Sequence, residues 1–96
     1  MNRAEVLDLL AHNKPTLVAR FGVDRLALFG STVRDAAQAD SDIDILVSFD
    51  GPATSERYFG VQFFLEDLLG RPVDLVTDKA LRPELRPSIE REAVHV

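Results

Sequence analysis

Three aspartates and one glycine–serine pair are the residues whose types and spacing suit chemistry. Gly30 and Ser31 follow a short apolar segment, and ten residues separate them from the stretch Asp42-Ile43-Asp44. In a strand, side chains two positions apart share a face, so the two carboxylates would lie roughly 7 Å apart at the backbone. Two neighbouring carboxylates repel each other, and a hard divalent cation removes that repulsion. The pair is therefore a candidate cation site.

The third aspartate, Asp74, lies in the apolar segment Pro-Val-Asp-Leu-Val-Thr. A lone carboxylate inside a short apolar strand is costly unless it is paired, hydrated or metal-bound. If this strand lies beside the strand of Asp42 and Asp44, three carboxylates meet near the Gly30-Ser31 turn. Backbone N–H groups of such a turn, and the serine hydroxyl, can receive a phosphate. Clustered carboxylates beside a phosphate-binding turn are what two-metal phosphoryl transfer requires.

Each feature also has a simpler structural explanation when it is taken alone. Asp-x-Asp occurs on the wet face of half-buried strands, and Gly-Ser forms strand-to-helix turns in which Ser31 would cap the helix. A calcium-binding loop that starts at Asp40 fails as a third explanation. Its sixth position holds Ile45 where glycine is required, and its twelfth holds Gly51 where glutamate is required.

A single α/β (α+β) domain over residues 1–96 is predicted around these residues, with helices packed on a small mixed sheet of three to four strands. Helical spacing of apolar residues, and glycines that end helices, predict the helices, with a kink or a second start at Pro15. Helical segments are expected over 2–21, 56–69 and parts of 81–93. Strands are expected over 25–29, 42–49, 72–77 and 93–96.

Composition excludes several classes of protein. The 96 residues carry a net charge of −5 and include no cysteine, which removes disulfides, thiolate metal sites and cysteine nucleophiles. No apolar run approaches the roughly 18 residues of a membrane helix, and the N-terminus does not have the pattern of a secretory signal, so a cytoplasmic protein is expected. The acidic balance, with scattered arginines and lysines, disfavours direct nucleic-acid binding.

Taken together, the motifs resemble the signature of the nucleotidyltransferase superfamily that includes DNA polymerase beta, poly(A) polymerase and kanamycin nucleotidyltransferase. That signature is Gly-Ser, ten residues, Asp-x-Asp and a later Asp on a neighbouring strand, which here are Gly30-Ser31, Asp42, Asp44 and Asp74. The small size and the segments SDIDILV, GRPVDLV and LRPSIEREAVHV are similar to minimal nucleotidyltransferases. Many members of that subgroup are encoded beside a helical HEPN protein as toxin–antitoxin pairs.

The resemblance implies a magnesium-dependent transfer of a nucleoside monophosphate, with AMP from ATP as the expected case, to a hydroxyl group. It implies that Asp42, Asp44 and Asp74 are catalytic and bind two Mg²⁺ ions, for which Mn²⁺ could substitute. It also implies that the triphosphate is bound by three further residues, Gly30, Ser31 and Arg34. Family members commonly have glycine after this arginine, whereas this chain has Asp35, which adds a negative charge near the phosphate path.

The acceptor is expected to come from outside the chain, because Val96 follows soon after the last predicted helix and leaves no room for the second domain of larger relatives. Either a HEPN-type protein partner supplies it, or a second copy of the chain completes the site. The predicted helix over 56–69 carries Phe59, Phe63 and Phe64 outside its main apolar stripe. It is therefore either wholly internal or apolar toward a partner.

Two other functions compete with this hypothesis. One is a non-enzymatic antitoxin that neutralises its partner by binding alone, for which three clustered aspartates would not be needed. The other is a nucleic-acid polymerase or tailing enzyme, which the acidic balance and the missing acceptor domain disfavour.

Overall fold

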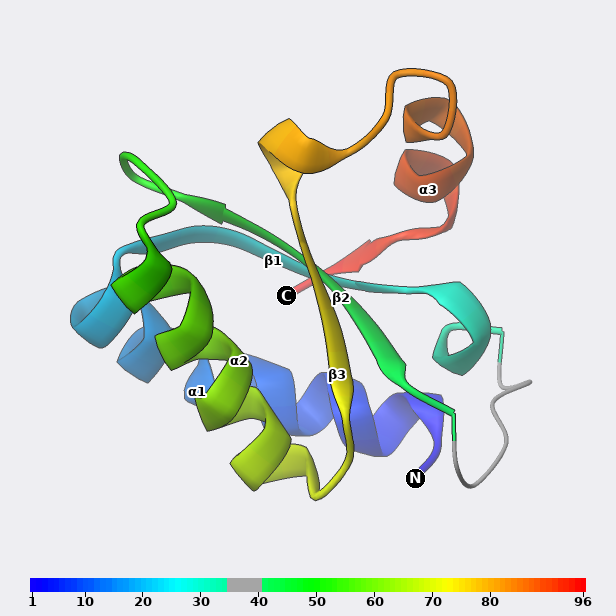
Figure 1. Cartoon of the computed structure of the whole chain (residues 1–96). Coiled ribbons are helices and arrows are strands. Elements are labelled where there is room, and N and C mark those ends of the chain that lie inside the picture. The colour runs from blue at the N-terminus through cyan, green and yellow to red at the C-terminus, as the bar shows by residue number, and fades with distance from the viewer. Residues whose placement is uncertain (35–40) are drawn as a thin grey trace.

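The computed structural model describes residues 1–34 and 41–96 (Figure 1). Two 3-10 turns, η1 (Gly30–Thr32) and η2 (Asp78–Ala80), follow the first and third strands. The α-helices are α1 (Arg3–Phe21), α2 (Ser55–Leu69) and α3 (Arg86–Glu92), and the β-strands are β1 (Val23–Phe29), β2 (Ile43–Phe49), β3 (Val73–Thr77) and β4 (Val94–His95). The predicted α/β fold class is confirmed.

The four strands form one mixed sheet in the order β3-β2-β1-β4. Strand β1 is antiparallel to both β2 and β4, whereas β2 and β3 run parallel. The parallel pair requires a crossover connection, which α2 provides. Because β2 is central and parallel to β3, residues at the start of β2 lie beside residues at the start of β3.

Helix α1 runs continuously through Pro15, so the predicted alternative of a second helix start there is wrong. Asn2 and Glu5 form a capping box at its start, and Gly22 ends it with a φ of +70°. Pro15 lies inside the helix, where its ring removes one backbone hydrogen bond. Leu10 and Leu17, on either side of it, are both fully buried in the same core. This burial offsets the local cost, since packing supplies most of a helix's stability.

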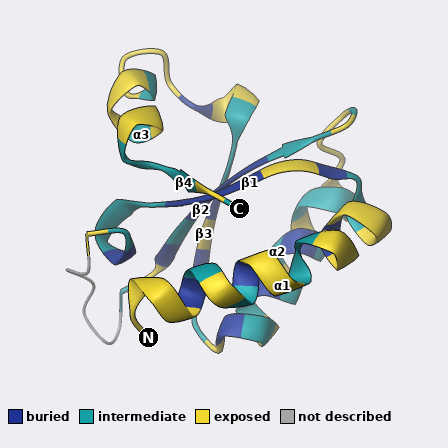
Figure 2. Cartoon of the chain, turned by 180° about the vertical axis from the view of Figure 1, so that it is seen from behind, coloured by how far each residue is buried: buried dark blue, intermediate teal, exposed yellow. Residues whose placement is uncertain are grey.

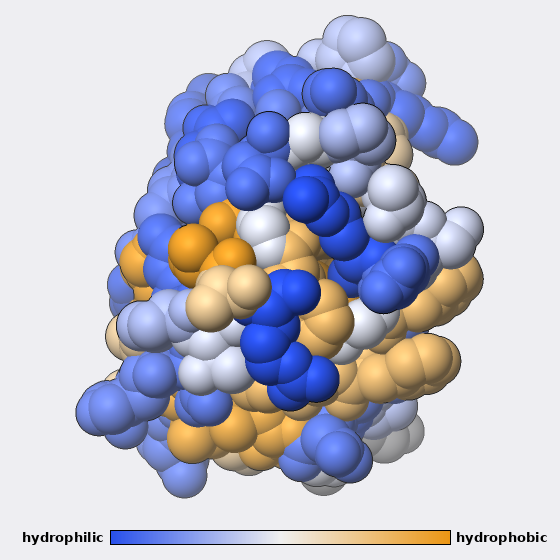
Figure 3. All heavy atoms as spheres, turned by 90° about the vertical axis from the view of Figure 1, so that its left-hand side faces the viewer, coloured by the Kyte–Doolittle hydropathy of each residue, from blue (hydrophilic) through white to orange (hydrophobic). Residues whose placement is uncertain are grey.

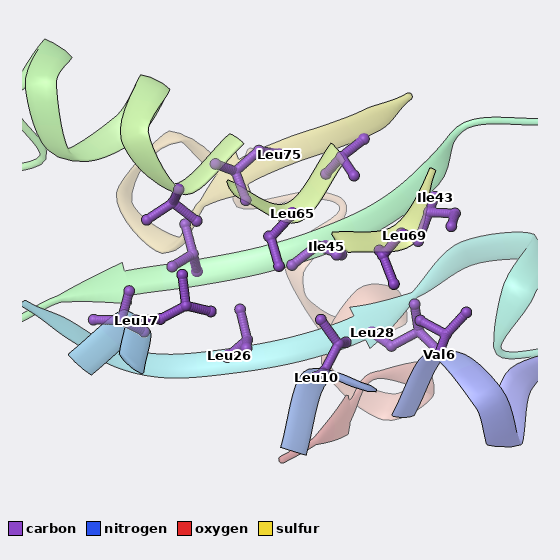
Figure 4. Close-up of a cluster of buried hydrophobic side chains, with 14 residues drawn as sticks. Val6, Leu10, Leu17, Leu26, Leu28, Ile43, Ile45, Leu65, Leu69 and Leu75 are labelled. Carbon is purple, nitrogen blue, oxygen red and sulfur yellow. The ribbon is translucent and has the colours of Figure 1, made fainter. Parts of the chain in front are cut away.

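Helices α1 and α2 lie together on one face of the sheet, and α3 lies on the other (Figure 1). The buried segments of both long helices face the sheet, and their exposed segments face solvent (Figure 2). Between them, side chains from the helices and the strands point toward one another (Figure 4). The buried residues of this main core are Val6, Leu10, Leu17, Val23, Leu26, Leu28, Ile43, Ile45, Val47, Val61, Leu65, Leu69, Val73 and Leu75.

The opposite face of the sheet carries a second, smaller core. Its buried members are Ala27, Leu46 and Leu81, and the partly buried residues packed against them are Phe29, Val76, Ile89 and Ala93. Leu46 shares the aspartate face of β2, yet only 6% of its surface is exposed. The interpretation of this face as simply wet is therefore wrong at Leu46, because η2, α3 and Leu81 cover the middle of the strand.

Helix α2 exposes two aromatic side chains. Phe59 and Phe63 are 49% and 64% exposed, and their rings stack with centroids 6.2 Å apart. Figure 3 shows apolar atoms between strongly hydrophilic ones on this side of the molecule. The helix is therefore not wholly internal. No helix in the described part of the chain has the length and apolar character needed to cross a lipid bilayer.

Candidate active site

The strand registers place Asp44 and Asp74, two of the three predicted catalytic residues, side by side. Asp44 pairs with Phe29 across the antiparallel β1–β2 ladder and with Asp74 across the parallel β2–β3 ladder. Gly30, the residue after Phe29, therefore lies next to Asp44 on one side, and Asp74 lies next to it on the other. The prediction that the third aspartate is on the neighbouring strand is confirmed. The ten-residue spacing is the length of chain that leaves β1 and returns antiparallel in this register.

Gly30 is required at this turn for two reasons. Its φ is +77°, a left-handed conformation that costs other residues free energy. A Cβ at this position would also lie 2.8 Å from Cγ of Asp44 and would overlap its carboxylate oxygen. Ser31 lies within η1, whose N-cap is Phe29 and has no side-chain cap. The simpler explanation of Ser31 as a helix cap is therefore wrong.

The carboxylate of Asp44 has an unusual electrostatic environment. Its pKa is raised to about 6, chiefly by burial, and next by repulsion from Asp74 and a hydrogen bond to Asp74. The charges of Asp42 and Glu92 contribute less. Asp42 and Asp74 are themselves exposed. A bound divalent cation would reverse this shift, because it stabilises the ionised form.

The residues present suit Mg²⁺ in their chemistry, because carboxylate oxygens are the donors that this hard cation prefers. Asp44 and Asp74 face each other across the β2–β3 ladder, and Asp42 directly precedes β2. Within residues 1–34 and 41–96, however, no three acidic or histidine side chains converge closely enough to hold an ion in this arrangement. The metal role of Asp42, Asp44 and Asp74 remains a prediction.

Sequence reasoning missed Glu92, the last residue of α3. Its Oε1 accepts a hydrogen bond from the backbone N–H of Gly30 at 2.5 Å, and its Oε2 accepts one from Nη1 of Arg34 at 2.7 Å. The Gly30 N–H, which was expected to face a phosphate, therefore binds a carboxylate of the chain itself. Glu92 is 62 positions from Gly30, so no local spacing in the sequence signals the contact.

Arg71 was also missed, and it lies near the acidic residues. Its guanidinium donates to the backbone carbonyl of Ser41, the residue before Asp42. This contact ties the loop before β3 to the start of β2, which steadies the strand ends that carry the aspartates. Asp35, which was expected to add negative charge near the phosphate path, lies outside the described residues.

A hollow of about 210 Å³ lies on the same face of the sheet but contains none of the predicted site residues. It is near Ser48, at the opposite end of β2 from Asp42 and Asp44. Its lining residues are Arg25, Leu46, Val47, Ser48, Asp78, Glu90 and His95. We therefore assign the candidate chemistry to the acidic strand ends and not to this hollow.

Comparison with known proteins identifies the family of the chain. Residues 14–96 match the family described as the nucleotidyltransferase domain. The chain belongs to the nucleotidyltransferase family. This nucleotidyltransferase is 39% identical over 92 residues to the protein adenylyltransferase MntA of Thermococcus cleftensis, and the match covers 96% of the chain and 93% of that relative. The predicted family and its enzymatic class are confirmed.

Solved structures share the fold of this nucleotidyltransferase. One described as a minimal nucleotidyltransferase superposes with a TM-score of 0.78 at 38% identity, covering 98% of this chain and 95% of that one. Another, an MNT antitoxin in complex with tri-AMPylated HEPN toxin of Shewanella oneidensis, gives a TM-score of 0.59 at 22% identity, covering 98% and 67%. The second likeness concerns the fold alone.

Proposed function

We propose that this nucleotidyltransferase transfers AMP from ATP to a side-chain hydroxyl of a HEPN-type partner protein in the cytoplasm, with Mg²⁺ as the metal. The observation that carries the proposal is the placement of Asp44 between the Gly30 turn and Asp74. The names of known proteins supply the substrate class, since the Thermococcus relative is a protein adenylyltransferase and the Shewanella toxin carries AMP groups.

The reaction moves one phosphoryl-linked group between two oxygens. The acceptor oxygen attacks the α-phosphorus of ATP and forms a new P–O bond, while the bond from that phosphorus to the bridging oxygen of the β-phosphate breaks. Pyrophosphate leaves with the electron pair of the broken bond, and the proton of the hydroxyl passes to a carboxylate or to water. Catalysis of such a transfer depends on positioning and on neutralising charge.

The residues of the chain divide this work between them. Asp42, Asp44 and Asp74 would hold the metal, and Asp74, which is exposed beside Asp44, would accept the proton of the attacking hydroxyl. The turn at Gly30 and Ser31 would receive the triphosphate, and Arg34 would offset its charge. When bound, Mg²⁺ supplies charge neutralisation and lowers the pKa of the attacking hydroxyl. We expect the acceptor to be a tyrosine, whose hydroxyl has an ordinary pKa near 10, is protonated at pH 7 and would need this activation.

Modification of this kind would inactivate a partner that binds RNA. Each AMP adds a bulky phosphodiester with a negative charge, which repels the RNA phosphates that the partner must approach. The partner would supply the acceptor hydroxyl in this proposal. A second copy of the chain would then be needed only if it completes the site.

The test is to incubate the purified chain with its HEPN partner, ATP and Mg²⁺, and to weigh the partner by mass spectrometry. A mass gain equal to one or more AMP groups is expected. The gain should disappear with Asp42→Ala/Asp44→Ala, and omission of ATP or chelation of Mg²⁺ should have the same effect. Isothermal titration that detects no ATP binding in the presence of Mg²⁺ would contradict the proposal.

A second candidate function, neutralisation by binding alone, is favoured by one observation. Phe59 and Phe63 leave an apolar surface on α2 exposed, and such a surface suits a protein partner. If the Asp42→Ala/Asp44→Ala chain neutralises the partner fully, and the wild-type chain adds no mass to it, this second function replaces the first.

A further inference from the structure

Glu92 connects two groups that the proposed reaction needs. One oxygen of its carboxylate holds the backbone of Gly30, and the other holds the guanidinium of Arg34. The side chain of Glu92 is 26% exposed, while that of Arg34 is 56% exposed. A single partly buried carboxylate thus fixes both the phosphate-binding turn and the exposed cation beside it.

The contact leaves Arg34 able to bind a ligand. A guanidinium has five N–H donors, and within residues 1–34 and 41–96 Arg34 bonds to Glu92 through Nη1, which leaves other donors for phosphate oxygens. A long exposed arginine otherwise samples many rotamers, and ordering it during binding lowers affinity. An arginine that is already held in place avoids most of this loss.

Glu92 itself is held firmly, because the elements around it are anchored. Ile89 and Ala93 pack against the small core of Ala27, Leu46 and Leu81. Strand β4, which follows α3, pairs with Ala27 and Leu28 of β1. Arg86, at the start of α3, binds Asp78 of η2 at 3.0 Å. The backbone that carries the Glu92 side chain is therefore held in place by packing, strand pairing and an ion pair.

We propose that Glu92 is a positioning residue for nucleotidyl transfer, which holds Arg34 and the Gly30 turn in the geometry that receives the triphosphate. This inference rests on the proposed function. The competing interpretation is that Glu92 stands in for a phosphate and must be displaced by the nucleotide. The two interpretations predict opposite effects when the charge of Glu92 is removed.

The first test measures ATP affinity with Mg²⁺ by isothermal titration in Glu92→Gln, with Glu90→Gln as the matched control. Glu90 is on the same helix, but its carboxylate binds Arg86 and not the turn. Glu92→Gln should raise the ATP dissociation constant about 10-fold, and Glu90→Gln should leave it unchanged. A lower dissociation constant in Glu92→Gln would overturn the proposal in favour of a phosphate stand-in.

A double-mutant cycle tests whether Glu92 acts through Arg34. Coupled residues give effects that are not additive. Glu92→Gln should raise the KM for ATP with little change in kcat, and its effect should be smaller in the Arg34→Gln background, where only the contact with the Gly30 turn is left to lose. Equal effects of Glu92→Gln in the presence and absence of the Arg34 guanidinium would contradict the proposal.

A third measurement does not depend on the nucleotide at all. The side-chain NMR signal of the Arg34 guanidinium should indicate an ordered group in the free protein, and it should become mobile in Glu92→Gln but not in Glu90→Gln. An unchanged Arg34 signal in Glu92→Gln overturns the positioning role even if AMP transfer is real. If the Arg34 guanidinium becomes mobile in Glu92→Gln but the wild-type chain transfers no AMP, the result contradicts the proposed function and leaves the contact between Glu92 and Arg34 intact. If Glu92→Gln does not fold, Glu92→Asp, whose shorter side chain cannot span both groups, is measured in the same three ways.

Discussion

The two faces of the sheet are built differently, although they share the same strands. On one face, α1 and α2 enclose the main core, and Ile43 and Ile45 of β2 are almost fully buried there. On the other face, Asp42 and Asp44 alternate with those isoleucines. Asp42 is exposed and Asp44 is half-buried, beside a small core whose buried members, among the described residues, are Ala27, Leu46 and Leu81. Strand β2 therefore supplies stability through its buried isoleucines and candidate chemistry through the aspartates that alternate with them.

The acidic site depends for its rigidity on the opposite, buried face of the sheet, which packs against α1 and α2. Carboxylates that repel each other would spread apart on a mobile strand. Here β2 is central in the sheet, between β1 and β3, and its buried residues pack against both long helices.

The largest effect is expected from Asp74→Asn on the acidic face. AMP transfer to the partner should fall about 100- to 1,000-fold, because the proton acceptor is lost. The free energy of unfolding should be unchanged or higher, because Asp74 is exposed and its charge repels Asp44. Transfer rates and urea unfolding measured on one preparation test both parts. A strong loss of stability would mean that the aspartate face also contributes to the stability of the fold.

Leu65→Ala, in the main core on the other face of the sheet, should lower stability strongly. Leu65 is fully buried in the main core, and its truncation should cost about 3 kcal/mol of unfolding free energy. Phe63→Ala, on the same helix but 64% exposed, should cost less than about 0.5 kcal/mol. Urea unfolding of the two variants makes the comparison. Similar losses for both would show that the exposed surface of α2 is packed in solution.

Gly30→Ala should affect both stability and ATP binding, and Gly70→Ala serves as its control. Both glycines have positive φ, but a Cβ at Gly30 would meet Asp44, whereas a Cβ at Gly70 has nothing within 4 Å among the described residues. Backbone strain alone should cost each variant about 1 kcal/mol. Gly30→Ala should lose roughly 1 kcal/mol more and should bind ATP less tightly. Equal unfolding curves and equal ATP affinities would remove the steric argument for Gly30.

The smallest effect is a pH dependence that Asp44 causes. Its folded-state pKa of about 6 lies above the ordinary value of 3.8, so the native state binds more protons between these values. The stability that this group contributes is therefore present below about pH 4 and is lost as the pH rises through 6. Because the group is partly solvated, we expect only about 1 kcal/mol.

Unfolding measured from pH 4 to pH 8 tests this dependence, with Asp44→Asn as the comparison. The variant should have a flatter profile and should be more stable than wild type near pH 8, while binding Mg²⁺ and ATP more weakly. If the two profiles run parallel, the raised pKa of Asp44 is not the cause of the wild-type slope.

Much of the fold was predictable because its signals are local. Alternation in β2 gives the faces of Ile43 and Asp44, the capping box at Asn2 begins α1, and Gly22 and Gly70 end the two long helices. The spacing from Gly30 to Asp42 was also informative, since it fixes the length of the connection between two antiparallel strands. These features depend on backbone geometry that neighbouring residues determine.

Other features were decided only by tertiary packing. Pro15 does not divide α1, because residues on both sides of it enter one core, and Leu46 is buried on the aspartate face because Leu81 and α3 reach it. Glu92 joins the site because β4 pairs with β1 and brings α3 across the sheet to the Gly30 turn. Such contacts link residues far apart in the chain, and no periodicity or local spacing encodes them, so they depend on how the elements pack.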